Sequence, residues 1–387
     1  MRTSISTSIS AIDPAAWDAL DAGGSPFLRH AFLAALEDSG CVGPRTGWQP
    51  APITLHDEHG LAAAAPAYIK AHSFGEFVFD FSWAQAYSHH GLEYYPKLVL
   101  GVPFTPASGA RLLIRPGLDA SRMRTALIDA IRAFAEERDL SSIHGLFVSD
   151  ADREAFAAAG WLARRDVQFH WHNDGYRDFD HYLESFTADK RKKAKRERRR
   201  VAEDGITFET LWGSQLDRAT IDEAFDLHRD TFLRHGNEPY LNRAFFRSLP
   251  KTAGDTFMIK RARCAGETVA AAMFFWSPEA LYGRYWGASE LHHSLHFETC
   301  YHQGIEFCIE RGIARFEPGT QGEHKVSRGF VPADTWSTHW IVDPRFRAAI
   351  ADALRREDPH VKNYAREIAQ HVPYRDGRRA ARQAGSK

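Results

Sequence analysis

Reactive side chains gather in one short segment, residues 316–325, which follows an apolar run and contains Pro318, Gly319 and Gly322. These breakers predict a loop at the end of a strand, a place where binding and catalytic groups often concentrate. The loop and the residues just after it offer carboxylates, an amide, an imidazole, an ammonium and a guanidinium: Glu317, Gln321, Glu323, His324, Lys325 and Arg328. A solvated, salt-bridged loop would have the same composition. We predict Glu317, His324 and Lys325 as the catalytic residues.

A second group of charged residues forms a predicted basic helix over 188–204, with Thr187 as its N-cap and Gly205 beyond its end. Like charges on neighbouring turns of a helix repel unless an anion relieves them. A phosphate-rich ligand such as RNA would do so, and its binding would weaken as salt rises. The predicted phosphate-binding residues are Lys192, Lys193, Arg196 and Arg199. The alternatives are a solvated basic face, or contact with acidic patches of the same protein.

An aromatic and charged cluster in the first half contains Asp80, Trp83, Tyr87, Tyr94, Tyr95 and Lys97. Aromatic side chains lining a groove suit sugar or peptide recognition, and they suit a hydrophobic core equally well. Lys97 fits a core least, because an unpaired buried ammonium is very costly. We predict Asp80, Tyr95 and Lys97 as substrate-binding residues.

Composition narrows the class of protein. The chain has 387 residues, room for two domains, and 44% apolar with 26% charged residues is typical of globular proteins. The net charge of −1 means that attraction to nucleic acid or membrane must come from local patches. No apolar run approaches the ~20 residues of a membrane-spanning helix, and no signal peptide is recognisable. The sequence therefore predicts a cytoplasmic protein without stable membrane insertion.

Neither cysteine nor histidine spacing predicts a metal site. Cys41, Cys264, Cys300 and Cys308 show no zinc-like spacing, so we expect reduced thiols. His292 and His296 stand four residues apart, a spacing that can share a metal on a helix. No carboxylate or cysteine completes the set, and no metal is predicted.

The elements that must position these groups recur in the same order in both halves. In the first half we predict strands 53–57, 61–69 and 76–83, helix 121–138 capped by Ser121, strand 143–148, helix 152–159 and strand 167–171. In the second half we predict strands 256–262, 268–276 and 281–286, helix 297–311 ended by Gly312, and strand 313–316. The repeated order suggests two copies of one fold.

A hairpin, a strand, a helix and a further strand form the central order of the GNAT-like acyltransferase fold. Several segments make a resemblance specific: 25–30, 83–87, 94–98, 168–171 and 316–330. On these segments the chain resembles the FemAB-like family of peptidoglycan biosynthesis and recognition, over residues 25–356.

The resemblance implies an α/β fold of the α+β type, with two tandem GNAT-like domains that are each a mixed sheet flanked by helices. We expect an N-terminal domain over 1–175 and a C-terminal domain over 176–356, including the basic helix. Residues 357–387 would form a C-terminal extension whose basic tail, from Tyr374 onward, is disordered. A cleft is expected between the domains.

In a GNAT-like sheet the reacting groups meet where the fourth and fifth strands part. Arg284 and Trp286 lie on the strand equated with the fourth, on one face by alternation, and Glu317 ends the fifth. Glu298 and Tyr301 share a helical face near that gap. The predicted substrate-binding residues here are Arg284, Trp286, Glu298, Tyr301, Gln321, Glu323 and Arg328. His324 or Glu323 could accept a proton from an attacking amine, and Lys325 or Arg328 could serve the oxyanion or a substrate phosphate.

The resemblance implies acyl transfer to an amine, most concretely from an aminoacyl-tRNA-type donor to an acceptor such as a peptidoglycan precursor. One alternative is an N-acyltransferase that uses an acyl-CoA-type thioester; another is a non-catalytic module that recognises a cell-wall peptide or glycan. The expected partners are thus an amine-bearing acceptor and charged tRNA, and the sequence does not determine the oligomeric state.

No cofactor is predicted, because the turn that usually binds coenzyme A is missing. Ordinary GNAT enzymes hold its pyrophosphate on a glycine-rich turn that opens a helix. The corresponding residues 287–297 lack the expected glycines, and Glu290 would repel a pyrophosphate. Residues 103–111 in the first half lack the signature as well.

Overall fold

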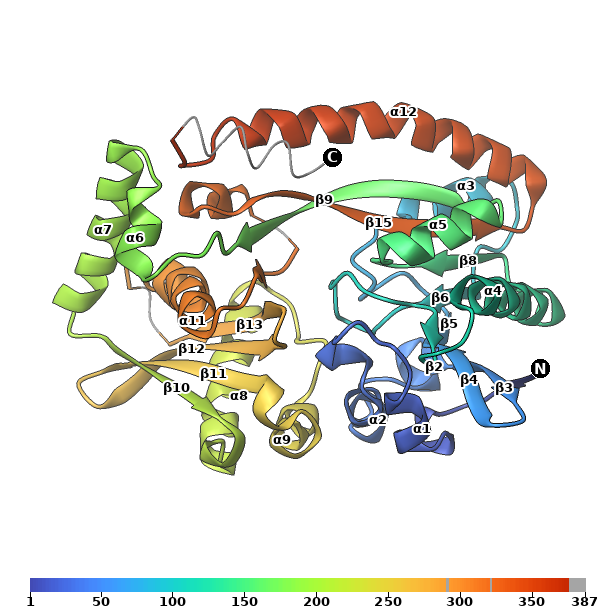
Figure 1. Ribbon diagram of the computed structural model, residues 1–387, viewed down its shortest axis with the longest axis horizontal. Coiled ribbons are helices and arrows are strands. Elements are labelled where there is room, and N and C mark those ends of the chain that lie inside the picture. The colour runs from blue at the N-terminus through green and yellow to red at the C-terminus, as the bar shows by residue number, and fades with distance from the viewer. Residues whose placement is uncertain (290–291, 321, 376–387) are drawn as a thin grey trace. The chain divides into compact units, whose positions relative to one another are not determined.

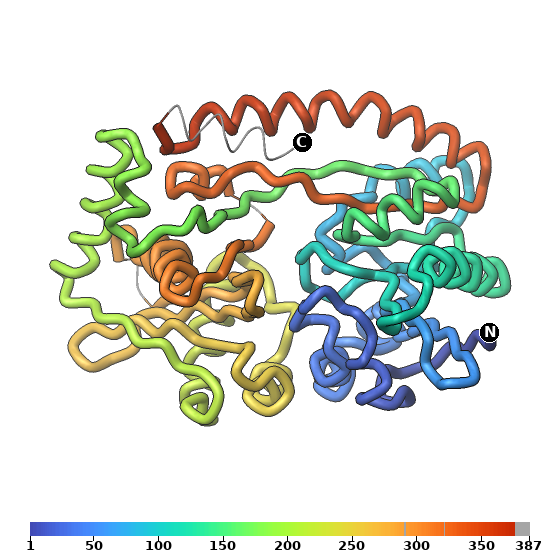
Figure 2. The backbone as a smooth tube through the Cα atoms, in the orientation of Figure 1, coloured from blue at the N-terminus to red at the C-terminus, as the bar shows by residue number. Residues whose placement is uncertain are grey.

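The computed structural model describes residues 1–289, 292–320 and 322–375, which divide into two compact units (Figure 1). Unit 1 consists of residues 1–166 and 334–362, and unit 2 of residues 167–333 together with residues from 363 onward. The colours of Figure 2 allow the chain to be followed through both. The predicted boundaries differ, since residues 334–356 belong to unit 1. They do so because β15 (Val331–Ile341) pairs antiparallel with β8 (Ser142–Gly145) there.

Unit 1 contains a small and a larger sheet. The small sheet is antiparallel, in the order β1 (Arg2–Ile5), β3 (Ile53–Asp57), β4 (Gly60–Ala65) and β7 (Leu113–Ile114). In the larger one β15 and β8 are followed by β6 (Lys97–Leu100), β5 (Ala67–Lys70) and β2 (Trp48–Pro50), with β6 and β8 parallel. Its helices are α1 (Pro14–Asp18), α2 (His30–Asp38), α3 (Phe81–His89), α4 (Ala120–Glu137) and α5 (Asp150–Ala158).

The core of unit 1 lies between α4 and these strands. Leu127, Ile128 and Ile131, at helical spacing, are buried against strand residues such as Leu98 and Ile143. The helix begins one residue earlier than predicted, because the carboxylate of Asp119, not Ser121, accepts the capping hydrogen bond.

The predicted strand over residues 76–83 is wrong. Residues 76–80 have no regular structure, and helix α3 begins at Phe81. Phe77 has a φ of 60°, in the left-handed region that no extended strand contains. The aromatic alternation therefore reflects exposed rings at Phe79 and Phe81 instead of a pleated sheet face.

The strands of unit 2 form one group of neighbouring β-strands with both parallel and antiparallel pairs. Its order is β10 (Thr207–Trp212), β11 (Phe257–Cys264), β12 (Glu267–Trp276), β13 (Ala280–Ala288), β14 (Arg315–Glu317) and β9 (Leu162–His172). Only β13 and β14 are parallel within this group. Its helices are α6 (Phe179–Glu184), α7 (Ala188–Glu203), α8 (Arg218–Arg234), α9 (Arg243–Thr252), α10 (Leu295–Phe297) and α11 (Gln303–Arg311), while α12 (Pro344–Ala369) is divided between the units.

The two faces of the unit 2 sheet carry different helices. Phe274 and Leu281 belong to the core cluster that includes α11, whereas the Tyr285 ring contacts His228 on α8 and Phe246 on α9. Helix α8 approaches β13 closely at Gly287, where a Cβ atom would lie 2.1 Å from the backbone of Leu227. A glycine is therefore required at this contact.

The predicted disordered tail is wrong at its start. Tyr374 is fully buried, and its hydroxyl donates a 2.6 Å hydrogen bond to the Gly329 carbonyl. The ring also packs on Phe186, so an aromatic contact rather than a periodic pattern holds this segment. Residues 376–387 lie outside the described residues. In the described part of the chain, no helix is both long and apolar enough to cross a membrane.

Candidate functional site

The first candidate site lies in unit 2, where β13 and β14 stop pairing. Their register ends at Tyr282 opposite Glu317, and Pro318 has no N–H to continue it. Two residues beyond Tyr282, a bulge interrupts the pairing of β13 with β12: Met273 faces Tyr285 and Phe274 faces Gly283. The extra residue is Arg284, and a bulge redirects the side chain that it carries. The predicted gap between these strands thus has a local cause.

Glu317 ends β14 as a buried carboxylate beside two cationic or titratable neighbours. Its Oε1 accepts a 2.9 Å hydrogen bond from Arg315 Nε, the salt bridge that the sequence left as an alternative to a site role. Its Oε2 is buried and has no hydrogen-bond partner among the described residues. Burial lowers the pKa of nearby His170 to about 4, although the charge of Glu317 acts in the opposite direction. His170 is therefore neutral at pH 7.

The sequence pattern does not predict His170 as a site residue, although residues 168–171 contribute to the family resemblance. On β9 the side chains alternate, so that Phe169 and Trp171 enter the core cluster of unit 2. His170, between them, points to the other face. An imidazole flanked by two core aromatics on a strand was the signal that could have identified it.

Lys325 is a buried cation of this site whose pKa is strongly lowered. It lies in a 3₁₀ turn, η7 (Glu323–Arg328), and is only 2% exposed. Its Nζ donates a 2.8 Å hydrogen bond to the Gly319 carbonyl across the loop. Burial, reinforced by the charge of Arg284, lowers the pKa of Lys325 to about 7. The amine can therefore exchange a proton at neutral pH.

His324 and Tyr301 form a hydrogen-bonded pair next to Lys325. The Tyr301 hydroxyl and His324 Nε2 are 2.8 Å apart. Burial and the charges of Lys325 and Arg328 lower the pKa of His324, which favours a neutral imidazole at pH 7. Tyr301 lies in a π-helical turn, Glu298–His302, between α10 and α11. Such turns are rare and often mark functional sites.

The ring of His296 lies between this pair and Trp286 on β13. The His296 ring lies 5.2 Å from the Trp286 ring and 6.0 Å from that of His324. Burial lowers the pKa of His296 to about 4, with His324 and Arg328 adding to the effect. The structure thus brings together Trp286, Tyr301 and His324 from three separate segments, and their common role as a site stays a prediction.

Three of the predicted substrate-binding residues already have protein partners. Arg328 pairs with Glu197 at 2.8 Å, and Glu298 accepts hydrogen bonds from Arg198 and Gln303. The exposed carboxylate of Glu323 accepts a 3.0 Å hydrogen bond from the Tyr364 hydroxyl. Their substrate contacts remain predictions. Gln321 and Glu290 lie outside the described residues.

The basic helix α7 has two different faces. Lys192, Lys193, Arg196 and Arg199 are exposed, as phosphate binding requires. Arg198 instead pairs with Glu298 and Glu306, and Glu197 is buried, so part of the helix does contact acidic groups of the same unit. Between residues 1 and 375, in the portion described, no three His, Cys, Asp or Glu side chains are grouped closely enough to hold a metal ion.

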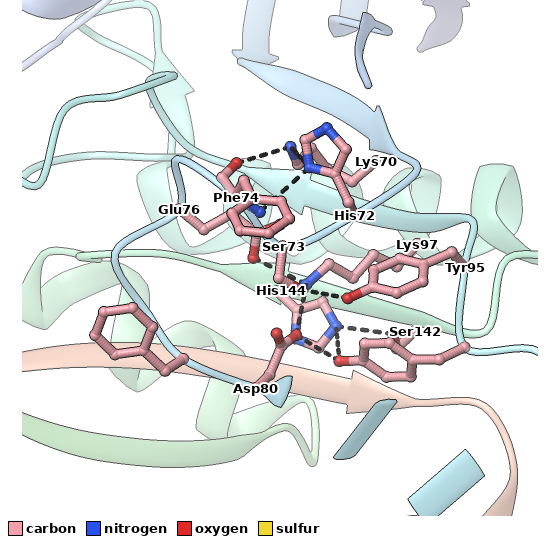
Figure 3. Close-up of polar contacts among 12 residues, drawn as sticks. Lys70, His72, Ser73, Phe74, Glu76, Asp80, Tyr95, Lys97, Ser142 and His144 are labelled. Carbon is pink, nitrogen blue, oxygen red and sulfur yellow. Dashed lines mark hydrogen bonds and ion pairs between the residues drawn. The ribbon is translucent and has the colours of Figure 1, made fainter. Parts of the chain in front are cut away.

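The second candidate site is a buried polar network in unit 1 (Figure 3). Lys97 is fully buried and pairs with the carboxylates of Glu76, at 2.9 Å, and Asp80. Its Nζ also donates to Ser73 Oγ at 2.9 Å, and the Tyr95 hydroxyl lies 2.8 Å from the same Ser73 oxygen. The structure thus joins the three predicted residues Asp80, Tyr95 and Lys97.

The pKa values of the two carboxylates that pair with Lys97 are shifted in opposite directions. Burial opposes ionisation of Asp80, but the charge of Lys97 outweighs it and lowers the pKa to about 2. For Glu76 burial dominates and raises the pKa to about 7. The sequence pattern does not predict Glu76 and Ser73, although carboxylate partners offset the cost of burying the Lys97 ammonium.

The network continues through aromatic and imidazole groups. The Tyr94 hydroxyl donates to Asp80 Oδ2 at 2.6 Å and lies 3.2 Å from His144 Nε2. His144 Nδ1 in turn lies 2.7 Å from His339 Nδ1. Burial lowers the pKa of His144 to about 3, so the imidazole that follows Asp80 and Tyr94 in this hydrogen-bonded network is neutral. Trp83, Tyr87 and Tyr94 are core residues here, the alternative that the sequence left open.

Comparisons with known proteins agree with this architecture. The crystal structure of FemX superposes with a TM-score of 0.56 at 11% identity, covering 91% of this chain and all of FemX. L-PGS from Bacillus licheniformis gives 0.51 at 12% identity, covering 83% and 95%, and a conserved protein of Bacteroides thetaiotaomicron VPI-5482 gives 0.53 at 11%, covering 86% and 98%. These similarities confirm the predicted mixed α/β fold, which this chain shares with FemX.

The curated proteins contain no match to this sequence. The sequence profile of the FemAB-like family, described as peptidoglycan biosynthesis/recognition, matches residues 8–376. This match covers nearly the whole chain and extends beyond residues 25–356, over which the sequence resembles the family. The chain belongs to the FemAB-like family.

Proposed function

We propose that this protein is an acyltransferase that moves an aminoacyl group from an aminoacyl-tRNA-type donor to the amine of a peptidoglycan-precursor-type acceptor. Membership of a peptidoglycan biosynthesis/recognition family supports the acceptor class. The observation that carries the chemistry is Lys325, a buried amine with a pKa of about 7 at the point where β13 and β14 part. Such a group serves proton transfer at neutral pH.

The reaction is the aminolysis of an ester. The acceptor nitrogen attacks the ester carbonyl, a tetrahedral oxyanion forms, and the bond to the ribose oxygen breaks. The amine must lose a proton and the departing ribose oxygen must gain one. His324, neutral at pH 7, accepts the amine proton, and Tyr301 orients its ring through the 2.8 Å contact. Lys325 in its ammonium form donates to the oxyanion and to the leaving oxygen.

Other residues hold the substrates. The exposed residues of α7, Lys192, Lys193, Arg196 and Arg199, bind the phosphates of the donor. Glu317, which is paired with Arg315, and the guanidinium of Arg284 set the electrostatic potential around the reacting carbonyl.

The first experiment measures binding of bulk charged and uncharged tRNA across a salt series. We expect salt-sensitive binding that is lost when Lys192, Lys193, Arg196 and Arg199 are all replaced by Glu. A matched control replaces four exposed arginines of other helices, Arg218, Arg345, Arg355 and Arg356, by Glu. The control should bind as the wild type does. Absence of tRNA binding at low salt would refute this donor and leave an acyl thioester or a recognition role.

A transfer assay then tests the chemistry. Charged tRNA with a radiolabelled aminoacyl group is incubated with a muropeptide precursor, and label in the precursor is measured. We expect His324→Gln and Lys325→Met to reduce transfer by roughly 10²–10⁴-fold, the usual contribution of a proton-transfer group. Unchanged tRNA binding in both variants would separate catalysis from donor binding. Normal transfer by Lys325→Met would overturn the assignment.

A further inference from the structure

The basic helix α7 contains a single acidic residue within its run of Lys and Arg from 190 to 200, and this residue points inward. Glu197 is 7% exposed, while Arg196 and Arg199 beside it are exposed. A carboxylate on this helix would reduce its attraction for phosphates if it faced outward. Its burial indicates a task inside unit 2.

Both oxygens of Glu197 lie against the candidate site. Oε1 accepts a 2.8 Å hydrogen bond from Arg328 Nη2, and Oε2 lies 3.6 Å from His302 Nε2. His302 belongs to the π-helical turn that also carries Tyr301. Arg328 closes the 3₁₀ turn that carries His324 and Lys325. Glu197 therefore contacts both segments that supply the reacting groups.

Arg328 links the Glu197 carboxylate to the backbone of the turn that carries His324. Its Nη1 donates to the His324 carbonyl at 2.6 Å and to Ser327 Oγ at 3.0 Å. Its guanidinium lies over the Phe297 ring, 3.3 Å from the centroid. A guanidinium held at several points has little freedom, and here the carboxylate of Glu197 sets which way it faces.

These contacts of Arg328 affect the hydrogen-bonded pair of His324 and Tyr301. An imidazole that accepts a proton must be held within tenths of an ångström and in one tautomer. The His324 backbone is held by Arg328, and its ring meets the Tyr301 hydroxyl at 2.8 Å. We propose that Glu197 is a positioning residue, which through Arg328 fixes the orientation and tautomer of His324. The catalytic importance of this rests on the proposed function; the geometric claim does not.

Nitrogen NMR of histidine rings tests the proposal without any substrate. Protein labelled with [¹⁵N]histidine is studied at pH 8, and the His324 signals are assigned by their loss in His324→Gln. In the wild type we expect ring-nitrogen shifts of one dominant tautomer. Tyr301→Phe, which removes the hydroxyl partner, shows how the averaged tautomer pattern looks when the contact is absent.

We expect Glu197→Gln to shift His324 from the single-tautomer pattern toward that of Tyr301→Phe. The matched control is Glu203→Gln, the same change at an exposed position of the same helix, which should retain the wild-type pattern. Arg328→Gln breaks the same connection from the other side and is expected to behave like Glu197→Gln, so that the test survives if one variant fails to fold. A wild-type tautomer pattern in the folded variant would overturn the proposal.

The readout also separates this proposal from the proposed function. If the NMR result is as expected but labelled amino acid never reaches the precursor, Glu197 still positions His324 and the assigned reaction is wrong. If transfer occurs and Glu197→Gln leaves both His324 and the transfer rate unchanged, the proposed function stands and the positioning role fails.

Discussion

Two buried lysines, Lys97 in unit 1 and Lys325 in unit 2, have opposite properties. In unit 1 Lys97 meets Glu76 and Asp80; burial disfavours its charge, but the two carboxylates outweigh this and raise its pKa. In unit 2 Lys325 meets a backbone carbonyl and the field of Arg284, and its pKa falls to about 7. The same side chain is thus a permanent cation in one unit and a proton carrier in the other.

The difference separates the effect of burial on the pKa of a lysine from the effect of a carboxylate partner. Removing an ammonium from water is costly in both units. Carboxylates at hydrogen-bond distance offset that cost for Lys97 and make it a structural anchor. A neutral carbonyl offsets little of it for Lys325, which therefore remains poised near neutral pH, a property that stability alone would not favour.

Breaking the ion pair of unit 1 should have the largest effect. Lys97→Met leaves two buried carboxylates without their cation, and we expect a loss of about 3–5 kcal/mol in the free energy of unfolding. Urea denaturation at pH 7 measures this loss. As a control, adding Asp80→Asn and Glu76→Gln to Lys97→Met should recover part of it, because neutral amides need no cation. A single variant as stable as the wild type would show that Lys97 is not an anchor.

Removing the lysine of unit 2 should have the opposite sign. Lys325→Met loses one hydrogen bond, worth about 1 kcal/mol, but removes an ammonium whose pKa is lowered by burial from 10.5 to about 7. We expect a gain of roughly 1–3 kcal/mol in the free energy of unfolding at pH 7. Urea denaturation beside the transfer assay would show a more stable and inactive protein. Lys325→Arg, which keeps a charge, should show no such gain.

The pH dependence sharpens the same comparison. Between pH 7 and 10.5 the unfolded chain holds a proton on Lys325 that the native state has released, so this group makes stability rise with pH over that range. The stability advantage of Lys325→Met should accordingly shrink as pH rises from 7 to 10, by about 1.4 kcal/mol per pH unit at most. Denaturation curves of both proteins at several pH values measure it. A constant difference would contradict the lowered pKa.

Lys70 provides the smallest effect and a comparison within unit 1. It is the register partner of Lys97 across β5 and β6, yet burial lowers its pKa to about 7. Its Nζ lies 3.7 Å from the Trp48 ring centroid and donates to the Phe74 carbonyl at 3.2 Å. Lys70→Met should change stability at pH 7 by less than about 2 kcal/mol, because loss of these contacts offsets relief of the buried amine. A loss as large as that of Lys97→Met in the same urea experiment would mean that Lys70 is also an anchor.

Much of the fold could be predicted because its signals are local. The turn at 57–60, the hairpin around Cys264–Glu267 and the helices now seen as α4 and α7 follow from turn residues and periodic apolar positions. Residues 76–83 were wrongly predicted as a strand, because a row of aromatics gives the same pattern whether its rings are buried or exposed. Tyr374 was assigned to a disordered tail because its partners, Phe186 and Gly329, are distant in the sequence.

The candidate sites divide in the same way. The loop with Glu317, His324 and Lys325 was visible as a cluster of reactive side chains among chain breakers. Glu76, His170 and Glu197 were not selected, since each acquires its meaning from a residue far away in the chain: Lys97, Glu317 and Arg328. A single sequence contains no record of such pairs.

The sequence by itself determined the family, the basic helix and the identity of the loop between residues 316 and 330. Only the tertiary structure decided which lysine is paired and which is not, which face of α7 turns inward, and which histidines are neutral. The physical reason is that pattern and propensity act over a few residues. The charge state of a buried group depends instead on burial and on neighbours that folding brings from elsewhere in the chain.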